Sequence, residues 1–168
     1  MVGSTGHRAT SLTVAQLNII GAAFAAGIVL FAAIALTVGP LGLAAEDGGT
    51  ESSDSLGTML LYVLGAQAIV VLPISFALRN AGVKRVAADR ESTLAQIDEG
   101  QVPTQLGGAI IVSAALVESL GLFGCVIVLL TGNMIALGAP VLAVLMILLE
   151  LPNQQRLREA VESAGRLR

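Results

Sequence analysis

The sequence predicts an all-α fold, that of a polytopic membrane protein with four transmembrane helices in an antiparallel bundle. Composition is the first observation behind this prediction: of 168 residues, 55% are hydrophobic and only 12% are charged, whereas soluble domains carry about 25% charged residues. The other two are the length of four apolar stretches and the position of the basic residues. The composition excludes a soluble globular domain and a disordered chain. The net charge of −3 gives no indication of nucleic-acid binding.

Four apolar stretches are long enough to cross a membrane, because a helix needs roughly 20 apolar residues to span ~30 Å of hydrocarbon. None of them contains Lys or Arg. Backbone groups in lipid must be hydrogen-bonded within the segment, which favours helices. The expected spans are 17–38, 56–78, 107–130 and 134–151, and together they make a transmembrane domain over 17–151.

The segments between the spans differ in length and charge. An acidic loop, 39–55, joins the first two spans, and a longer polar loop, 79–106, joins the second and third. Thr131-Gly132-Asn133 is short enough to be a tight turn, which predicts that the last two spans form a hairpin. The first span is longer than the apolar core of a signal peptide, about 7–15 residues, so we expect it to be retained as an anchor.

The basic residues predict the orientation in the membrane. All nine lie in the arm 1–16, the loop 79–106 or the tail 152–168, which four crossings place on one side. Because cytoplasmic segments carry an excess of Lys and Arg, we expect both termini and this loop to be cytoplasmic, in a bacterial inner (plasma) membrane. The basic residues are Arg8, Arg79, Lys84, Arg85, Arg90, Arg156, Arg158, Arg166 and Arg168.

Glu118 lies near the centre of the third span. An ionised carboxylate at that depth costs ~2.5–3.5 kcal/mol even on the scale derived from insertion experiments. The group can avoid this cost by taking up a proton or by pairing inside the bundle, and in either case we expect it to face protein. Ala114, Ala115 and Gly121 share its face, and their small size lets a neighbouring helix approach closely.

The first two spans offer groups that could pack against this face. The second span has one strongly polar side chain, Gln67, near its midpoint. Because Gln67 and Glu118 sit at similar depth, we predict a hydrogen bond between them, with Tyr62 or Ser119 as further partners. The first span repeats small residues at helical spacing: Gly21, Ala22, Ala25, Ala26, Gly27 and Ala33.

Two functions fit Glu118. In the first, an interhelical hydrogen bond, worth only ~0.6 kcal/mol on average, fixes helix register, and the protein is a structural or accessory member of a membrane assembly. In the second, Glu118 and Gln67 form an ion-binding site that takes up a proton or cation. Glu150, at the end of the fourth span, is interpreted as an interfacial charge within reach of water or Arg156.

The segment from Ile111 to Leu130 resembles the carboxylate-bearing helix of the c subunit, the proteolipid of rotary ATP synthases. In that family a small-residue stretch precedes an ionisable Glu, and an aromatic residue and a glycine follow it. Glu118, Phe123 and Gly124 occupy the corresponding places. The resemblance implies proton binding and release at Glu118. The chain departs from that family in its long polar loop and in lacking a Gly-x-Gly repeat in the second span.

From the third span to the tail, the chain also resembles an uncharacterised family of four-span bacterial membrane proteins. The shared pattern is an Ala-Leu-x-Glu-x-x-x-Leu-Phe-Gly helix, a Thr-Gly-Asn turn and a fourth span that ends at Pro. This resemblance implies the fold but no activity. The matching residues are Leu116, Glu118, Leu122, Phe123, Gly124, Thr131, Gly132, Asn133 and Pro152.

The tail is expected to form an amphipathic helix at the lipid headgroups. Asn153 can cap this helix, and Leu157 and Val161 lie on its apolar face. Arg158 and Glu162 are four residues apart and can form an ion pair on its exposed face.

The motifs of the chain argue against an enzyme. The sequence contains no Walker-type phosphate loop, no Rossmann glycine fingerprint, no His-Glu-x-x-His and no Gly-x-Ser-x-Gly. A single buried carboxylate without a second acid, base, metal or nucleophile does not make a mechanism. His7 and Cys125 each stand alone. We therefore expect no cofactor and no metal site, and as partners the lipid bilayer and either further copies of the chain or a larger membrane complex.

Overall fold

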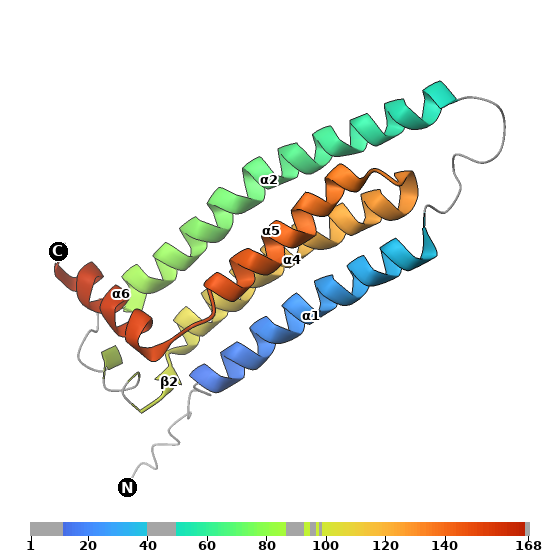
Figure 1. The fold of residues 1–168 in the computed structure, drawn as a ribbon. Helices are drawn as coiled ribbons and strands as arrows, with labels where there is room; N and C mark the ends of the chain where they lie inside the picture. Colours follow the sequence, from blue (N-terminus) through green and yellow to red (C-terminus); the bar gives the residue numbers. More distant parts are fainter. Residues whose placement is uncertain (1–11, 40–49, 87–92, 95–96, 98, 167–168) are drawn as a thin grey trace, which may run out of the picture.

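The computed structural model of the chain is mostly helical, and its long helices lie side by side (Figure 1). It describes residues 12–39, 50–86, 93–94, 97 and 99–166. The elements in chain order are β1 (Leu12–Thr13), α1 (Val14–Val38), α2 (Thr50–Val86), β2 (Gln101–Val102), α4 (Thr104–Thr131), the 3-10 helix η2 (Met134–Leu137), α5 (Gly138–Leu149) and α6 (Gln154–Arg166).

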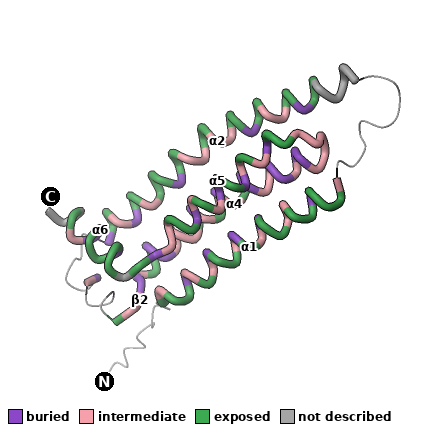
Figure 2. The backbone as a smooth tube through the Cα atoms, viewed as in Figure 1, coloured by how far each residue is buried: buried purple, intermediate pink, exposed green. Residues whose placement is uncertain are grey.

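In the described part of the chain, three helices, α1, α2 and α4, are long and apolar enough to cross a membrane. The segment predicted as the fourth span, 134–151, is shorter: four residues of 3-10 helix precede 12 residues of α-helix, which ends at Leu149. Large apolar side chains are exposed along α1, α2 and α5, and in Figure 2 green segments recur along these helices between pink and purple ones. Lipid rather than water suits such a surface, because monomeric soluble proteins rarely expose large contiguous apolar patches.

α1 begins three residues before the predicted span because Thr13 caps it. The Thr13 hydroxyl accepts a hydrogen bond from Gln16 N at 3.2 Å, and Gln16 Oε1 accepts one from Thr13 N at 2.9 Å. This reciprocal pair is a capping box, which satisfies two amide groups that the first turn leaves without partners.

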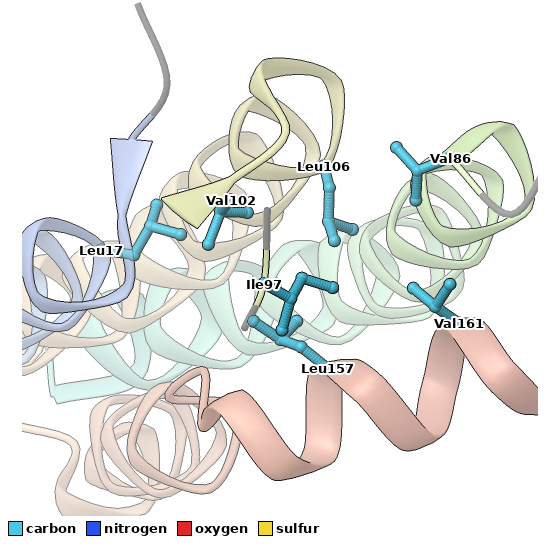
Figure 3. Close-up of a cluster of buried hydrophobic side chains, with 7 residues drawn as sticks. All are labelled: Leu17, Val86, Ile97, Val102, Leu106, Leu157 and Val161. Atoms are coloured by element: carbon cyan, nitrogen blue, oxygen red, sulfur yellow. The ribbon is translucent and has the colours of Figure 1, made fainter. Parts of the chain in front are cut away.

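α2 continues eight residues beyond the predicted span, to Val86. The last turns of α2 are polar, but Val86 at their end is buried against other apolar residues at one end of the molecule, and this packing stabilises them. We call this place the basic end, since Arg79, Lys84 and Arg85 lie close by on α2. Its core, drawn in Figure 3, consists of Leu17, Val86, Ile97, Val102, Leu106, Leu157 and Val161.

α6 supplies part of this core. Leu157 is 5% exposed and Val161 is fully buried, so the apolar face that the sequence assigned to the lipid headgroups packs on protein. The cap and the ion pair predicted for this helix are confirmed. Asn153 Oδ1 accepts from Gln155 N at 3.3 Å, and Arg158 Nε lies 3.2 Å from Glu162 Oε1.

The strands β1 and β2 form a short antiparallel ladder at the basic end. Leu12 pairs with Val102 and Thr13 with Gln101, which ties the residues before α1 to the residues before α4. Sequence reasoning missed this ladder, because two-residue strands leave no periodic pattern.

The predicted turn after α4 is confirmed. Gly132 has φ of 69° in the left-handed region, and its N–H donates to Val128 O at 2.8 Å. This is a common way to end a helix, because glycine adopts that conformation without a Cβ clash. The chain then returns along α4: a Cβ built on Gly124 would lie 2.8 Å from Ala136 O and 2.8 Å from Ala139 Cβ.

Candidate functional site

Glu118 lies halfway along α4 and is half-buried. Its carboxyl group points at α1: a Cβ built on Gly27 would lie 3.4 Å from Glu118 Oε1. On the side of α1, Glu118 faces protein as predicted. Because Gly27 has no side chain, the Glu118 carboxyl group has space next to the backbone of α1. Gly27, one of the small residues noted in the first span, therefore lies next to the Glu118 carboxyl group.

The partners predicted for Glu118 do not meet it. No hydrogen bond of the described residues joins Glu118 to Gln67, which is itself half-buried on α2. The Ser119 hydroxyl donates instead to Leu116 O of its own helix at 2.7 Å. Tyr62 is 77% exposed. The carboxyl group therefore lies at mid-helix without a hydrogen-bonding or ionic partner in the described part of the chain.

Helix geometry explains why no hydrogen bond joins Gln67 to Glu118. α2 packs on α4 at Ala109, whose Cβ would lie 2.8 Å from a Cβ on Gly82. Ala109 precedes Glu118 by nine residues, which is two and a half turns at 3.6 residues per turn, so the two side chains leave α4 in opposite directions. The pairing was predicted because the two residues lie at equal depth. The rotation of α4 about its axis, however, directs Glu118 towards α1, whereas α2 packs on the opposite side of α4.

The helices around Glu118 approach closely at glycines. A Cβ on Gly121 would lie 2.9 Å from Ala143 Cβ of α5 and 3.2 Å from Ile28 Cδ1 of α1. A Cβ on Gly21 of α1 would lie 2.7 Å from Leu151 Cδ2. Interfaces between membrane helices rely on such small residues, because lipid provides no hydrophobic force that drives helices together.

A small cavity of about 20 Å³ lies between α1, α4 and α5, nearer the basic end than Glu118. That volume holds about one water molecule. Its lining residues are apolar apart from Glu150. The lining residues from α1 are Leu17, Ile20 and Gly21, those from α4 are Ile110, Ile111 and Ala114, and the others are Ile147, Glu150, Leu151 and Pro152.

Glu150 is bound by a residue that the sequence did not suggest. Arg79 Nη1 of α2 lies 3.4 Å from Glu150 Oε1, and both side chains are about one third exposed (32% and 28%). Arg156, the partner expected from sequence spacing, donates instead to Leu149 O at 3.0 Å. It thereby satisfies a carbonyl group that the last turn of α5 leaves free.

The described residues contain no group of three or more His, Cys, Asp or Glu side chains that could hold a metal ion. Cys125 is fully buried among apolar residues of α4 and its neighbours. His7 lies outside the described residues.

Comparisons with protein-family models, with curated proteins and with solved structures give no match to this chain. The resemblance to the c subunit therefore stays a prediction, and the geometry around Glu118 is the main indication of function. Sequence reasoning found Glu118 by its position in an apolar helix. It missed Gly27 as the contact and Arg79 as the partner of Glu150, because both contacts join residues far apart in the chain.

Proposed function

We propose that the chain is an integral membrane protein that crosses a bacterial inner membrane four times, as an antiparallel bundle with both termini in the cytoplasm. The length of the fourth segment supports this topology. At ~2.0 Å per residue of 3-10 helix and ~1.5 Å per residue of α-helix, η2 and α5 reach roughly 26 Å, close to the hydrocarbon thickness. The core at the basic end also supports this topology. Residues of α1, α2, α4 and α6 pack together there, as expected if the arm 1–16, the loop 79–106 and the tail 152–168 lie on the same side of the membrane.

We propose further that Glu118 binds a proton reversibly within the membrane. The observation that carries this proposal is the carboxyl group at mid-helix with Gly27 as its neighbour and without a described polar partner. A structural role through an interhelical hydrogen bond needs such a partner. Without one, the lowest-energy state in lipid is the neutral acid, and ionisation requires water or a cation to reach the site.

The half-buried position of Glu118 suits reversible binding better than a permanent role in the core. A carboxylic acid enclosed by packed side chains would be closed to any other molecule, whereas part of the Glu118 side chain is accessible from outside the bundle. The likeness of this helix to the c subunit supports the same function. Gln67, which has no hydrogen bond to Glu118 among the described residues, is not needed for the proposed proton binding.

Carbodiimide labelling tests this function, since carbodiimides react with protonated carboxyl groups in an apolar environment. We expect dicyclohexylcarbodiimide to label Glu118 of the purified protein in lipid vesicles, and the labelling rate to fall as pH rises and the acid loses its proton. Peptide mass spectrometry identifies the labelled residue. Glu118→Gln should abolish the labelling, and Glu150→Gln should retain it.

Either of two results would contradict the proposal. Labelling could be absent from Glu118 at every pH, or it could proceed at one rate across the whole pH range at which the protein stays folded. The first result means that the group is permanently paired, and the second that it never exchanges its proton.

A structural or accessory role in a larger assembly is the second candidate function. The exposed apolar surface of α2 favours it, because a helix of another protein could cover this face instead of lipid. For this function, Glu118→Gln would change the size of the assembly extracted in mild detergent and leave no proton-dependent property altered. An unchanged size, together with pH-dependent labelling of Glu118 in the wild type, would favour proton binding.

A further inference from the structure

We propose that the outer side of α2 at the basic end binds an anionic phospholipid. Its phosphate lies between Lys84 and Arg85, and one acyl chain lies along the exposed apolar side chains of the preceding turns. The inference rests on the proposed crossing of the membrane and is independent of proton binding at Glu118.

Lys84 and Arg85 lie on the part of α2 that faces away from the bundle. Gly82 packs on α4, where its added Cβ would lie 2.8 Å from Ala109 Cβ, and Val86 is buried in the core of the basic end (Figure 3). Lys84 is two residues from Gly82 and two from Val86, a rotation of about 200° around the helix in each case. Lys84 and Arg85 are accordingly exposed.

These two positive charges are not neutralised within the described part of the chain. Arg79 and Arg158 each form an ion pair with a glutamate, and Arg156 donates to a backbone carbonyl group. Among the described residues, no ion pair or hydrogen bond involves Lys84 or Arg85. Two adjacent cations are therefore available to a negatively charged ligand.

Ala81 leaves a place for a phosphate group between the two cations. It precedes Lys84 by three residues and Arg85 by four, so that Lys84 lies about 60° to one side of it around the helix and Arg85 about 40° to the other. Long side chains of a helix lie over the preceding turn, which here contains Ala81. Ala81 is exposed and has only a methyl group, and both lysine and arginine bind phosphate oxygens.

An exposed apolar strip of α2 continues from this place into the membrane. Ala77, Ile74 and Val70 precede Ala81 by four, seven and eleven residues, which puts them on one face of the helix. Ala77 is exposed, and Ile74 and Val70 are 46% and 55% exposed. From Ala81 to Val70 the helix rises about 16 Å, close to half of the ~30 Å hydrocarbon thickness and hence to the length of one acyl chain.

The cations also lie at the depth of lipid headgroups. Lys84 follows Leu78, where the predicted span ends, by six residues, which is about 9 Å of helix. Its side chain leans back towards the membrane, into a headgroup layer that is about 5–8 Å thick on each side. An acidic soluble protein could neutralise the same charges but would leave the adjoining apolar strip unused. A phospholipid matches both parts of the surface.

Native mass spectrometry of the full-length protein in detergent tests this site. The probes are dioleoyl phosphatidylglycerol and dioleoyl phosphatidylcholine, which share their acyl chains and differ in net charge. We expect the wild type to retain several-fold more of the anionic lipid than of the zwitterionic lipid. Equal retention of the two lipids would overturn the proposal.

Substitutions of single cations locate the site. Lys84→Gln and Arg85→Gln should each lower the retention of phosphatidylglycerol several-fold and leave that of phosphatidylcholine unchanged, whereas Lys84→Arg should keep most of it. Arg158→Gln is the matched control, because it removes one exposed charge from the basic end on α6. It should behave like the wild type. An equal loss in Lys84→Gln, Arg85→Gln and Arg158→Gln would contradict a site on α2.

A second pair of variants tests the place between the cations without changing any charge. Ala81→Leu fills this place, whereas Ala23→Leu makes the same change at an exposed position of α1. We expect retention of phosphatidylglycerol to fall several-fold in Ala81→Leu and to stay unchanged in Ala23→Leu. Glycerol 3-phosphate, which has the phosphate but no acyl chain, should not displace the lipid. Displacement would show that a free phosphate is sufficient and would overturn the assignment to a lipid.

The outcomes separate this inference from the function on which it rests. Circular dichroism shows that each variant is folded, and extraction of vesicles with alkaline carbonate tests insertion. If the protein stays in the vesicles but Lys84→Gln, Arg85→Gln and Ala81→Leu retain phosphatidylglycerol like the wild type, membrane crossing stands and the lipid site is wrong. If carbonate releases the protein, membrane crossing itself fails and the lipid site with it.

Discussion

α2 and α4 have nearly the same hydropathy and very different surroundings. Their most apolar windows have mean hydropathies of 2.1 and 2.2, yet 11% of the α2 window and 39% of the α4 window is buried inside the protein. Hydropathy therefore indicates that a helix belongs in a membrane, but it does not indicate whether lipid or protein surrounds it.

The difference lies in where each helix carries its glycines. Gly121 and Gly124 of α4 lie at contacts with α1 and α5, where an added Cβ would come within 3 Å of another residue. Gly65, in the middle of α2, has no atom within 4 Å of its added Cβ, and the close glycine contact of α2 lies near its end, at Gly82. α4 is thus the central helix of the bundle, and α2 lies at its periphery.

The largest expected effect is at the centre. Gly124→Leu places a side chain where Ala136 O, a backbone atom, lies 2.8 Å from the first carbon. Because a backbone oxygen cannot rotate away, we expect a loss of more than about 3 kcal/mol in the free energy of unfolding, above the usual range for overpacking. Thermal unfolding in detergent, followed by circular dichroism, measures it.

Gly65→Leu is the matched control on α2. It should leave the free energy of unfolding unchanged or slightly higher, because leucine favours a helix more than glycine by about 0.5–1 kcal/mol. Equal destabilisation by the two substitutions would show that α2 is as closely packed as α4.

An intermediate effect is expected at the basic end. Leu157→Ala removes a buried side chain that holds α6 to the core containing Val86 of α2. We expect a loss of about 2 kcal/mol, the lower limit for a buried leucine, since α6 can shift to fill part of the space. Amide hydrogen exchange should rise at Val83 and Val86 of α2 and stay unchanged at the centre of α4. A rise at Val117 or Leu120 as well would contradict the peripheral position of α2.

The smallest effect is expected for the ion pair between α2 and the end of α5. Arg79→Gln removes the partner of Glu150. Because both side chains are partly exposed, the pair should contribute no more than about 1 kcal/mol. A double-mutant cycle with Glu150→Gln measures the coupling in unfolding experiments, and a coupling well above that value would mean that α2 is held to the bundle more firmly than its packing indicates.

The sequence predicted the elements that depend on local composition. The apolar stretches at 17–38, 56–78 and 107–130 all lie within observed helices, because length and hydropathy are properties of a continuous segment. The turn at Gly132, the Asn153 cap and the Arg158–Glu162 pair were predicted for the same reason, since each joins residues within a few positions of one another.

Contacts between distant segments could not be predicted in this way. Gln67 and Glu118 were paired by depth alone, and depth says nothing about the rotation of a helix about its axis. The apolar face of α6 was assigned to lipid because an amphipathic pattern does not distinguish a membrane surface from a protein surface. The β1–β2 ladder and the pairing of Arg79 with Glu150 depend wholly on the tertiary arrangement.

The β1–β2 ladder gives α1 and α4 a common starting level. Gly27 follows the first residue of α1 by 13 positions, and Glu118 follows the first residue of α4 by 14. At ~1.5 Å per residue, the two helices have risen about 20 Å and 21 Å when glycine and carboxyl group meet. A sliding of α1 by one turn would replace Gly27 with Phe24 or Phe31 opposite Glu118. The pairs Leu12–Val102 and Thr13–Gln101 thus set the height along the two helices at which Gly27 and Glu118 meet.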